Sequence, residues 1–293
     1  MMAFAESPFD HFAETARPTL EAELARCLPQ VSPESLARAI SEAVLSPGKR
    51  LRPLVALAAG DLAGAAAPAA SAVAVSIEYV HAASLVLDDL PSMDNARRRR
   101  GKPALHLVHG AATAELVSVC LVARAFELVG GAPGTSAATR ARLARELARA
   151  VEACCAGQAA DLEATPERLR LEDLEGIHAR KTGALFVAAV RGGALAGGAR
   201  EPQLEALTRF ARNLGLAFQI TDDLLDLEGD ETLMGKDRGR DAHRANFARL
   251  LGVASSRRLV EELSAAAVEA LRPLGRRARV LSDLARAVRE RRA

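Results

Sequence analysis

Apolar residues recur every three or four positions along most of this 293-residue chain, the spacing that places them on one face of an α-helix. No run alternates between apolar and polar residues as a half-buried strand would. Gly, Pro and polar clusters break the pattern at intervals. We therefore predict an all-α protein in which residues 1–293 form one domain. Helices are expected at residues 8–28, 33–45, 54–64, 69–90, 110–130, 136–164, 202–228, 256–272 and 276–291, with one more around Lys181.

Prolines and hydroxyl side chains set several expected boundaries. Pro18 is expected to split the first segment, so that its regular helix starts only there. Ser32 and Pro33 suit the N-cap and the first position of the second helix, and Thr165 suits a cap for the helix that follows it. Residues 229–247 form a long polar stretch. A loop of this length inside a domain is either functional or disordered, and the functional option is a lid.

Composition narrows the class of protein. With 49% hydrophobic and 26% charged residues the chain can bury a sizeable core, and because only 3% are aromatic that core must be mainly Ala, Leu and Val. The net charge of +2 gives no reason to expect a nucleic-acid partner. No stretch supplies the ~20 uninterrupted apolar residues of a membrane span, and the N-terminus lacks the features of a signal peptide. The four cysteines show no Cys-x-x-Cys spacing, which favours a reduced, cytoplasmic setting.

Three carboxylates, Asp88, Asp89 and Asp94, follow an apolar run and precede four arginines. Carboxylates gathered at the end of a buried helix repel one another unless a cation joins them. Mg²⁺ takes one or two carboxylates together with substrate phosphates, which the arginines can also bind. Asp88 and Asp94 are about 240° apart on a regular helix, so they share a site only if the helix is interrupted, and Pro91 provides the interruption. The alternative is a solvated charge run at a helix end.

A second acidic stretch follows later in the chain. Asp222 and Asp226 are four apart, so they lie on one helix face, with Gln219 one turn before them. Like charges at this spacing destabilise a helix by roughly a few tenths of a kcal/mol unless something positive lies between them. Two acidic helix segments, each followed by basic residues, therefore predict two walls of one metal–diphosphate site.

Cations earlier in the chain fall where such a site can use them. Lys49 and Arg52 lie in a tight turn between two prolines and can form an anion clamp, although surface loops of this kind also occur without function. His81 is two helical turns before Asp88 and so shares its face. A lone His in an apolar helix is more often structural, but this alignment favours the site.

Two further groups of polar residues interrupt apolar helices. Lys181 and Thr182 precede Gly183, and a glycine inside a helix lets other backbone approach or leaves a carbonyl free for a ligand. Gln158 and Asp161 are three apart and share a helix face. Both groups are candidates for the same site.

These motifs resemble those of the trans, or head-to-tail, isoprenyl diphosphate synthases, which make geranyl, farnesyl and geranylgeranyl diphosphates. The resemblance rests on the two Asp-rich motifs in the right order, the Gly-Lys-Arg-Leu-Arg-Pro turn and Lys-Thr-Gly, and it extends from Pro47 to about Gly252. It implies the isoprenoid synthase fold, a bundle of long antiparallel helices around a deep central cavity, usually as a homodimer. The implied reaction joins isopentenyl diphosphate to dimethylallyl, geranyl or farnesyl diphosphate through an allylic carbocation.

The resemblance also implies roles for individual residues. Three Mg²⁺ ions would be held by Asp88, Asp94 and Asp222, with Asp226 and Asp161 close by. The allylic diphosphate would be bound by Arg99, Lys181 and Lys236. Isopentenyl diphosphate would be bound by Lys49, Arg52, His81 and Arg100, and Arg244, which replaces a lysine of the family, is a further substrate-binding candidate. Thr182 and Gln219 would lie beside the carbocation, so the residues implied in catalysis are Asp88, Asp94, Asp222, Lys181, Thr182 and Gln219.

Several positions depart from the family pattern. They are Ala96 and Arg97 (Asp in many members), Val119 (also Asp), Pro47 (Gly) and Asn246–Phe247 (Thr-Tyr). These departures bear on lid closure and on pairing with a partner chain, and they leave open a non-catalytic regulatory subunit of a synthase. A terpene cyclase would share the first motif but carry an Asn/Ser/Glu metal triad in place of the second.

Product length depends on steric room below the metal site. The growing tail must extend along the helix that leads to Asp88, and the residues about one turn before it, Ala83 and Ser84, are small. Many farnesyl-forming relatives place an aromatic ring there. Geranylgeranyl diphosphate is therefore the expected product. The alternative is that Ala83 only permits close helix packing while Phe126 or Phe186 forms the floor, which gives farnesyl diphosphate.

Overall fold

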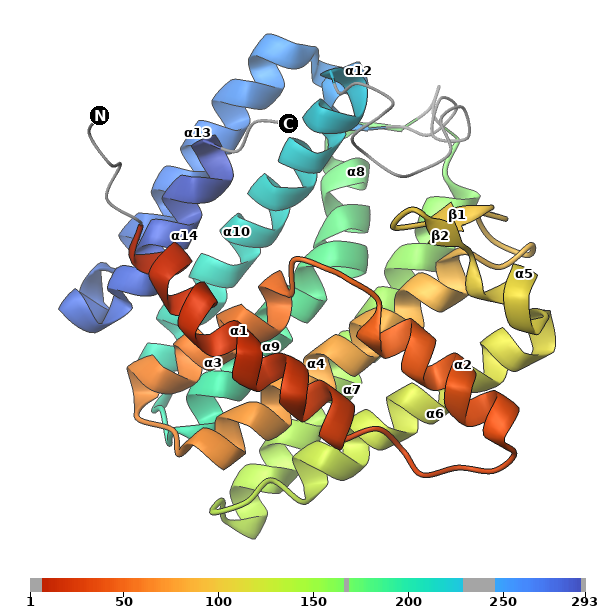
Figure 1. The fold of residues 1–293 in the computed structure, drawn as a ribbon. Coiled ribbons are helices and arrows are strands. Elements are labelled where there is room, and N and C mark those ends of the chain that lie inside the picture. The colour runs from red at the N-terminus through yellow and green to blue at the C-terminus, as the bar shows by residue number, and fades with distance from the viewer. Residues whose placement is uncertain (1–6, 166–168, 229–245, 291–293) are drawn as a thin grey trace, which may run out of the picture.

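The computed structural model describes residues 7–165, 169–228 and 246–290, and these parts are almost entirely helical (Figure 1). The longest helices are α4 (Ala67–Asp88), α6 (Ala111–Gly130), α7 (Ala137–Glu163) and α10 (Glu201–Glu228). The others are α1 (Pro8–Arg26), α2 (Glu34–Leu45), α3 (Leu51–Ala63), α5 (Leu105–His109), α8 (Leu171–His178), α9 (Ala184–Ala196), α12 (Phe247–Leu251), α13 (Val253–Ala270) and α14 (Arg279–Glu290). A π-helical turn, η2 (Ala179–Gly183), joins α8 to α9, and a 3₁₀ segment, η4 (Arg272–Ala278), joins α13 to α14. The all-α prediction is confirmed.

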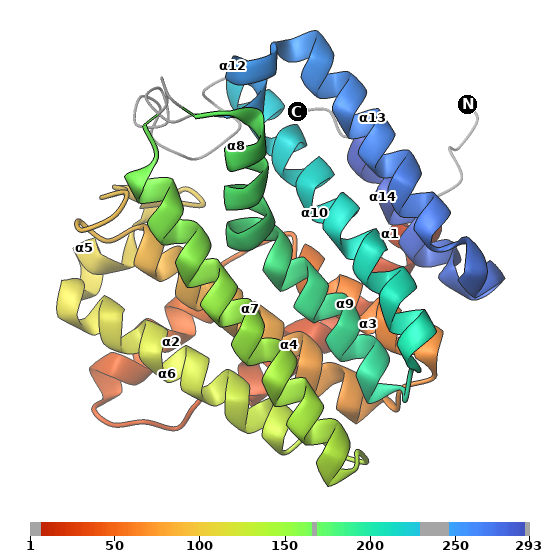
Figure 2. The same cartoon turned by 180° about the vertical axis from the view of Figure 1, so that it is seen from behind.

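Helix α4 lies at the centre of the bundle, packed against α3, α6 and α9. Seen from behind, α6 and α7 lie in front of it (Figure 2). Among the described helices, α4 alone is long and apolar enough to cross a membrane, and 72% of its apolar window is buried inside the protein. Its apolar side chains are therefore accounted for by core packing.

Small residues let the helices approach closely. A methyl group at Gly193 of α9 would overlap the carbonyl oxygen of Ala56 in α3, so this contact requires glycine. One cluster of buried apolar side chains runs from Phe9 in α1 to Val288 in α14. Most of its members are Ala, Leu and Val, as the composition predicted.

Pro18 does not split the first helix, and that prediction was wrong. α1 begins at Pro8, after Ser7, whose Oγ accepts a hydrogen bond from the backbone N–H of Asp10 (3.1 Å). Pro18 has no N–H group to donate to the carbonyl oxygen of Glu14, four residues earlier. Both residues are exposed. The missing bond therefore falls on the solvent side, where water can replace it, and the buried face continues past it.

Contrary to expectation, Ser32 does not cap α2 and Thr165 does not cap α8, while residues 166–168, directly after Thr165, lie outside the described residues. α2 has Pro33 as its N-cap residue and no capping side chain. An N-cap side chain bonds to N–H groups two or three residues later, so Ser32 lies one residue too early. The N-cap residue of α8 is Arg170, whose backbone N–H donates to the Asp173 carboxylate (3.3 Å).

A short hairpin after the first acidic motif was not predicted. Strand β1 (Arg98–Arg99) pairs antiparallel with β2 (Lys102–Pro103). Arg100 and Gly101, between them, have positive φ angles of 53° and 78°, the pattern of a type I′ turn. Strands of two residues are too short to show alternation, so the sequence pattern could not reveal them. The hairpin carries two of the arginines expected to bind substrate.

Candidate active site

The first acidic motif lies where α4 ends. The helix stops at Asp88, and the chain then reverses so that the backbone N–H of Asp94 donates to the carbonyl oxygen of Asp88 (2.9 Å). The interruption that the sequence required is present, although the helix ends shortly before Pro91. Burial raises the pKa of Asp88 to about 6, an effect that Lys181 opposes and the charge of Asp94 reinforces. The motif therefore gathers negative charge in a buried place.

Asp89, whose charge also raises the pKa of Asp88, binds Arg99. Both oxygens of the buried Asp89 carboxylate accept from Nε of Arg99 at 3.1 Å, and Nη2 donates to the same group. A guanidinium bound through two nitrogens has a fixed plane. Asp89 therefore orients Arg99, and direct binding of the allylic diphosphate by Arg99 stays a prediction.

The second acidic motif lies near the C-terminal end of α10. Asp222 is half-buried and Asp226 is exposed. Asp223 is buried, and its oxygens accept from Nε2 of Gln219 and from the backbone N–H of Phe247, both at 2.9 Å. Burial raises the pKa of Asp223 to about 6. Asp223, whose role the sequence did not reveal, therefore anchors α12 and orients the Gln219 amide.

The π-helical turn η2 connects the two acidic motifs. Its Lys181 donates to Oδ2 of Asp161 (2.6 Å) and lies near enough to Asp88 to lower that pKa. Its Thr182 donates through Oγ1 to Oε1 of Gln219 (2.9 Å). The structure thus brings Thr182 and Gln219 together, as the resemblance implied.

Glycines on two neighbouring helices hold η2 in place. A Cβ atom on Gly157 of α7 would overlap the backbone of Lys181. The sequence placed a close backbone approach at Gly183, and the structure has one there too: a Cβ atom on Gly215 of α10 would come within 3.1 Å of the Gly183 Cα atom. The turn is therefore confined between α7 and α10, and π-helical turns often mark functional sites.

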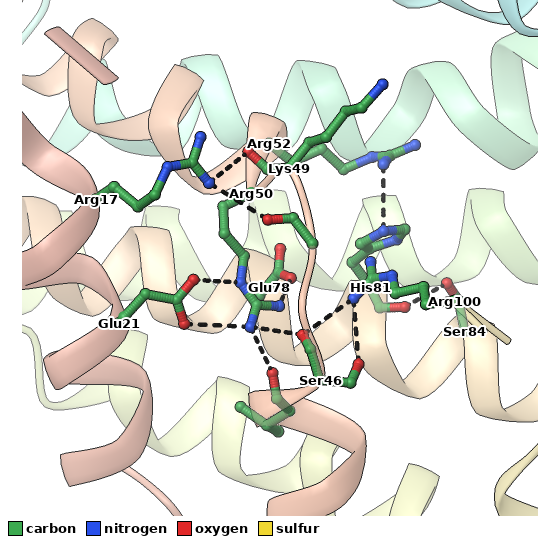
Figure 3. A network of polar contacts seen from close by, with 12 residues as sticks. Arg17, Glu21, Ser46, Lys49, Arg50, Arg52, Glu78, His81, Ser84 and Arg100 are labelled. Atoms are coloured by element: carbon green, nitrogen blue, oxygen red, sulfur yellow. Dashed lines mark hydrogen bonds and ion pairs between the residues drawn. The ribbon is translucent and has the colours of Figure 1, made fainter. Parts of the chain in front are cut away.

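The cations expected to bind isopentenyl diphosphate gather around the start of α3 (Figure 3): Lys49, Arg52, His81 and Arg100. Nη1 of Arg52 lies 3.4 Å from Nε2 of His81, and its guanidinium lies 4.7 Å from the centre of the Phe186 ring. Nη1 of Arg100 donates to the carbonyl and hydroxyl oxygens of Ser46 (3.4 and 3.3 Å). Burial and the neighbouring arginines lower the pKa of His81 well below 6.5, so its ring is neutral at pH 7.

The acidic residues suit Mg²⁺ that is bound together with phosphate. In residues 7–165, 169–228 and 246–290, no three His, Cys, Asp or Glu side chains converge as in a preformed metal site. Mg²⁺ usually keeps several waters and takes one or two carboxylates plus substrate phosphates. Aspartates on two separate helices therefore fit Mg²⁺ ions that take their remaining ligands from a bound diphosphate. Burial, reinforced by the charges of Asp94 and Asp89, raises the pKa of Asp88, and a divalent cation would stabilise its charged form.

The chain is similar in sequence and in structure to known proteins. Residues 33–270 match the family model for polyprenyl synthetase. The chain belongs to the polyprenyl synthetase family. It is 38% identical to geranylgeranyl pyrophosphate synthase 4 of Arabidopsis thaliana, over 86% of this chain and 70% of that protein. It is 39% identical to farnesyl diphosphate synthase of Geobacillus stearothermophilus, over 86% of this chain and 88% of that protein.

The same family relation appears in three dimensions. The solved structure of a geranyltransferase from Helicobacter pylori, complexed with magnesium and isoprenyl diphosphate, matches this polyprenyl synthetase with a TM-score of 0.85 at 28% identity, over 98% of each chain. The family and fold that the motifs indicated are thereby confirmed. The chain is a prenyltransferase with the all-α isoprenoid synthase fold.

One buried ion pair of this polyprenyl synthetase was not predicted. The side chains of Arg50 and Glu78 are 1% and 3% exposed, and Nη1 of Arg50 lies 2.6 Å from Oε1 of Glu78. The sequence does indicate that Glu78 has a partner. It is the one acidic residue of the apolar helix α4 before Asp88, and a buried carboxylate is almost always paired. The partner could not be chosen, because it lies 28 positions away among several arginines.

Part of the predicted site lies outside the described residues, namely Lys236, Arg244 and the remainder of 229–245. Where the description resumes, Asn246 caps α12 by accepting from the backbone N–H of Arg249 (2.8 Å). The buried Phe247 ring packs on His178, with ring centres 5.5 Å apart. Asn246 and Phe247 depart from the family pattern at the end of the expected lid. In this structure the first is a helix cap and the second a buried core residue.

Proposed function

We propose that this chain condenses isopentenyl diphosphate head-to-tail with an allylic diphosphate to give a longer prenyl diphosphate. The observation that carries the proposal is that one aspartate of each acidic motif lies near a different cation. Lys181 acts electrostatically on Asp88, and Asp222 acts on Arg52. Two diphosphates can then bind side by side, the allylic one at the carboxylates and the other at the cations around the start of α3.

The proposed magnesium sites, three ions in all, use Asp88, Asp94, Asp222 and Asp226. When bound, Mg²⁺ stabilises the charge that develops on the departing allylic diphosphate. Lys181 and Arg99 add positive charge from the protein. Asp161 and Asp89 hold these two cations in place, so little reorganisation is needed when the carbon–oxygen bond breaks. The magnesium named for the Helicobacter pylori geranyltransferase supports the choice of metal.

Thr182 and Gln219 are proposed to face the carbocation. The Thr182 hydroxyl donates its hydrogen to Gln219, so oxygen lone pairs remain to face positive charge. The Gln219 amide is itself fixed because it donates to Asp223. The double bond of isopentenyl diphosphate then forms the new carbon–carbon bond, and the released diphosphate accepts the proton that is lost.

Incubation of the purified protein with Mg²⁺ and labelled isopentenyl and dimethylallyl diphosphates tests this function. An elongated prenyl diphosphate is the expected product. A cyclic hydrocarbon would identify a terpene cyclase. Binding of both substrates without turnover would leave the non-catalytic subunit as the better assignment.

The proposed product is geranylgeranyl diphosphate, with farnesyl diphosphate as the alternative. Ala83 is buried beside α6, where its carbonyl oxygen accepts from Ser118 Oγ (3.2 Å), and Ser84 is half-buried. Neither places a large ring on the helix that leads to Asp88. Ala83→Phe is expected to shift the product from twenty to fifteen carbons, measured by chromatography after dephosphorylation. A fifteen-carbon product from the unaltered protein, unchanged in the variant, would show that another residue sets the floor.

The proposed partner is a second copy of the chain. Four large apolar side chains of α5 and α6 are more than half exposed: Leu107, Val108, Leu116 and Val119. Apolar residues gathered on one face typically mark an interface. Val119 stands where many relatives carry Asp, and its exposed apolar side chain adds to this face.

A further inference from the structure

A buried arginine organises the turn that joins α2 to α3 (Figure 3). Nη1 of Arg50 donates to Oε1 of Glu78 (2.6 Å), while Nε and Nη2 donate to the two carboxylate oxygens of Glu21 (2.9 and 3.2 Å). Nη2 also donates to the carbonyl oxygens of Val44 (2.9 Å) and Ser46 (3.0 Å). One side chain therefore connects α1, the end of α2 and α4.

Stability alone explains this arrangement poorly. Removing an arginine and a glutamate from water costs free energy, and apolar residues of similar volume often fill such positions equally well. Arg50 also has a left-handed backbone conformation, with φ 49° and ψ 33°, which side chains with a Cβ atom rarely adopt. Two unfavourable features at one residue point to a function that retains it.

The turn that Arg50 holds carries the cations proposed for isopentenyl diphosphate. Lys49 precedes Arg50, and Arg52 is the second residue of α3. From α1, Arg17 donates to the carbonyl oxygens of Gly48 (3.3 Å) and Lys49 (3.2 Å). The backbone of the turn is thus bound from the α1 side, and Figure 3 shows the side chains of Lys49 and Arg52 pointing away from the buried pair.

Glu78 ties the same turn to the helix that carries His81. The two residues are three apart in α4, so they lie about one helical turn from each other. The Arg50–Glu78 pair therefore fixes the start of α3 against α4 at the level where Arg52 meets His81 (3.4 Å). The negative charge of Glu78 also offsets repulsion among the cations of the turn, which would otherwise separate them.

We propose that Arg50, acting through Glu78, is a positioning residue that sets Lys49 and Arg52 relative to His81 for the diphosphate of isopentenyl diphosphate. This inference rests on the proposed substrate site. Arg50 itself does not touch substrate, because its nitrogens are directed at protein acceptors. Loss of the pair displaces the turn and leaves η2 and α10, which bind the allylic diphosphate in the proposed mechanism, in place.

The test replaces both members of the pair, so that no buried charge is left alone. In Arg50→Met/Glu78→Met we expect the KM for isopentenyl diphosphate to rise at least about tenfold, since displaced binding groups lose much of their effect. The KM for the allylic substrate and kcat should stay within about twofold. Arg50→Lys keeps the charge but lacks the planar guanidinium that binds several acceptors at once. Its KM for isopentenyl diphosphate should therefore fall between those of the wild type and the double variant.

A matched ion pair elsewhere separates positioning from stability. Arg191 of α9 binds Glu146 of α7 (2.9 Å), and both side chains are largely buried. Arg191→Met/Glu146→Met should change neither KM, whether the thermal unfolding midpoint rises or falls. Unfolding midpoints of all variants are measured beside the kinetics, and Glu78→Gln, which keeps the shape of the side chain, serves if the double variant does not fold.

Arg52→Ala distinguishes failure of the inference from failure of the proposed site. If Arg52→Ala raises the KM for isopentenyl diphosphate while the folded Arg50 and Glu78 variants leave it unchanged, the positioning role is overturned and the site stands. Equal rises for both substrates in the Arg50 variants overturn it as well. If Arg52→Ala itself leaves that KM unchanged, the proposed substrate site is wrong, and the inference falls with it.

Discussion

Asp88 and Asp222 belong to different helices but are proposed to act on the same leaving group. We expect Asp88→Ala and Asp222→Ala each to lower kcat at least about a hundredfold, the usual effect of removing one group that stabilises transition-state charge. Both variants should remain folded without Mg²⁺, because the loss of attraction to nearby cations is offset by relief of repulsion within the acidic motif. Turnover at saturating Mg²⁺ is the measurement, and Asp61→Ala, an exposed carboxylate of α3, is the control. Near-normal turnover in either active-site variant would remove that aspartate from the metal site.

The acidic motifs and the Lys49–Arg52 turn, which the sequence revealed first, share one property, which is that their charges cluster along the chain. Asp88 and Asp94, or Lys49 and Arg52, stand out because neighbours of like charge need an external partner. The role of Asp223 could not be predicted from charge clustering, because the backbone N–H that it binds belongs to Phe247, 24 positions away. Its buried contacts appear only once α10 and α12 pack together.

His178 predicts a pH dependence of stability. Neither ring nitrogen has a hydrogen-bond partner within residues 7–165, 169–228 and 246–290, and burial lowers the pKa of His178 from 6.5 to about 4. The unfolded chain therefore takes up a proton as the pH falls through 6.5, whereas the folded protein does not until about pH 4. Stability that is present above pH 6.5 is lost through this window. By linkage, the expected loss between pH 7.5 and pH 5 is about 2 kcal/mol.

Urea unfolding at the two pH values measures this effect. His178→Leu should remove about 2 kcal/mol of the pH dependence, whereas His11→Leu, at an exposed histidine, should not. An unchanged pH dependence in His178→Leu would mean that the buried ring is not the group that takes up the proton.

At the scale of elements, the backbone contact between α7 and η2 sets the position of two active-site residues. Gly157→Ala places a methyl group against the backbone of Lys181, so η2 must move, and overpacking of this kind costs about 1–3 kcal/mol. We expect kcat to fall and the KM for the allylic substrate to rise, because Lys181 and Thr182 move together. The free energy of unfolding should fall as well.

Gly176→Ala in α8 is the matched control. The nearest atom to its new methyl group, Nη1 of Arg180, is 3.7 Å away, an ordinary contact. Because Ala favours helices over Gly by up to about 1 kcal/mol, this variant should be as stable as the wild type or more so, with unchanged kinetics. If Gly157→Ala behaves in the same way, η2 is not held by α7.

The helices themselves were largely predictable, while their ends were not. Long amphipathic segments such as 136–164 and 202–228 repeat their pattern over many turns, and α7 and α10 match them within one residue at each end. The boundaries at Pro18 and Ser32 failed because they were assigned from residue type. Whether a proline breaks a helix depends on which side of the helix faces solvent, which is a tertiary property. Short elements such as α5 and β1 lack enough residues to show any period.

At the scale of the whole molecule, the apolar face of α5 and α6 predicts self-association. Helix α5 and the start of α6 lie at one edge of the bundle (Figure 1), and Leu116 and Val119 are 56% and 66% exposed. We expect a dimer in sedimentation equilibrium at micromolar concentration. Leu116→Glu/Val119→Glu should weaken it at least about a hundredfold, because each unpaired charge buried in an interface costs several kcal/mol.

Leu250→Glu provides the control for that experiment, because Leu250 is also an exposed leucine, 40% exposed, but belongs to α12. It adds the same charge to a different face, so it should leave the dimer intact if the association is specific to α5 and α6. A monomer from the unaltered chain would remove the second copy as the partner of this face. A dimer that survives Leu116→Glu/Val119→Glu would place the interface elsewhere. Turnover measured beside the association decides whether pairing matters for activity: a monomeric variant with normal turnover would show that each chain contains a complete site.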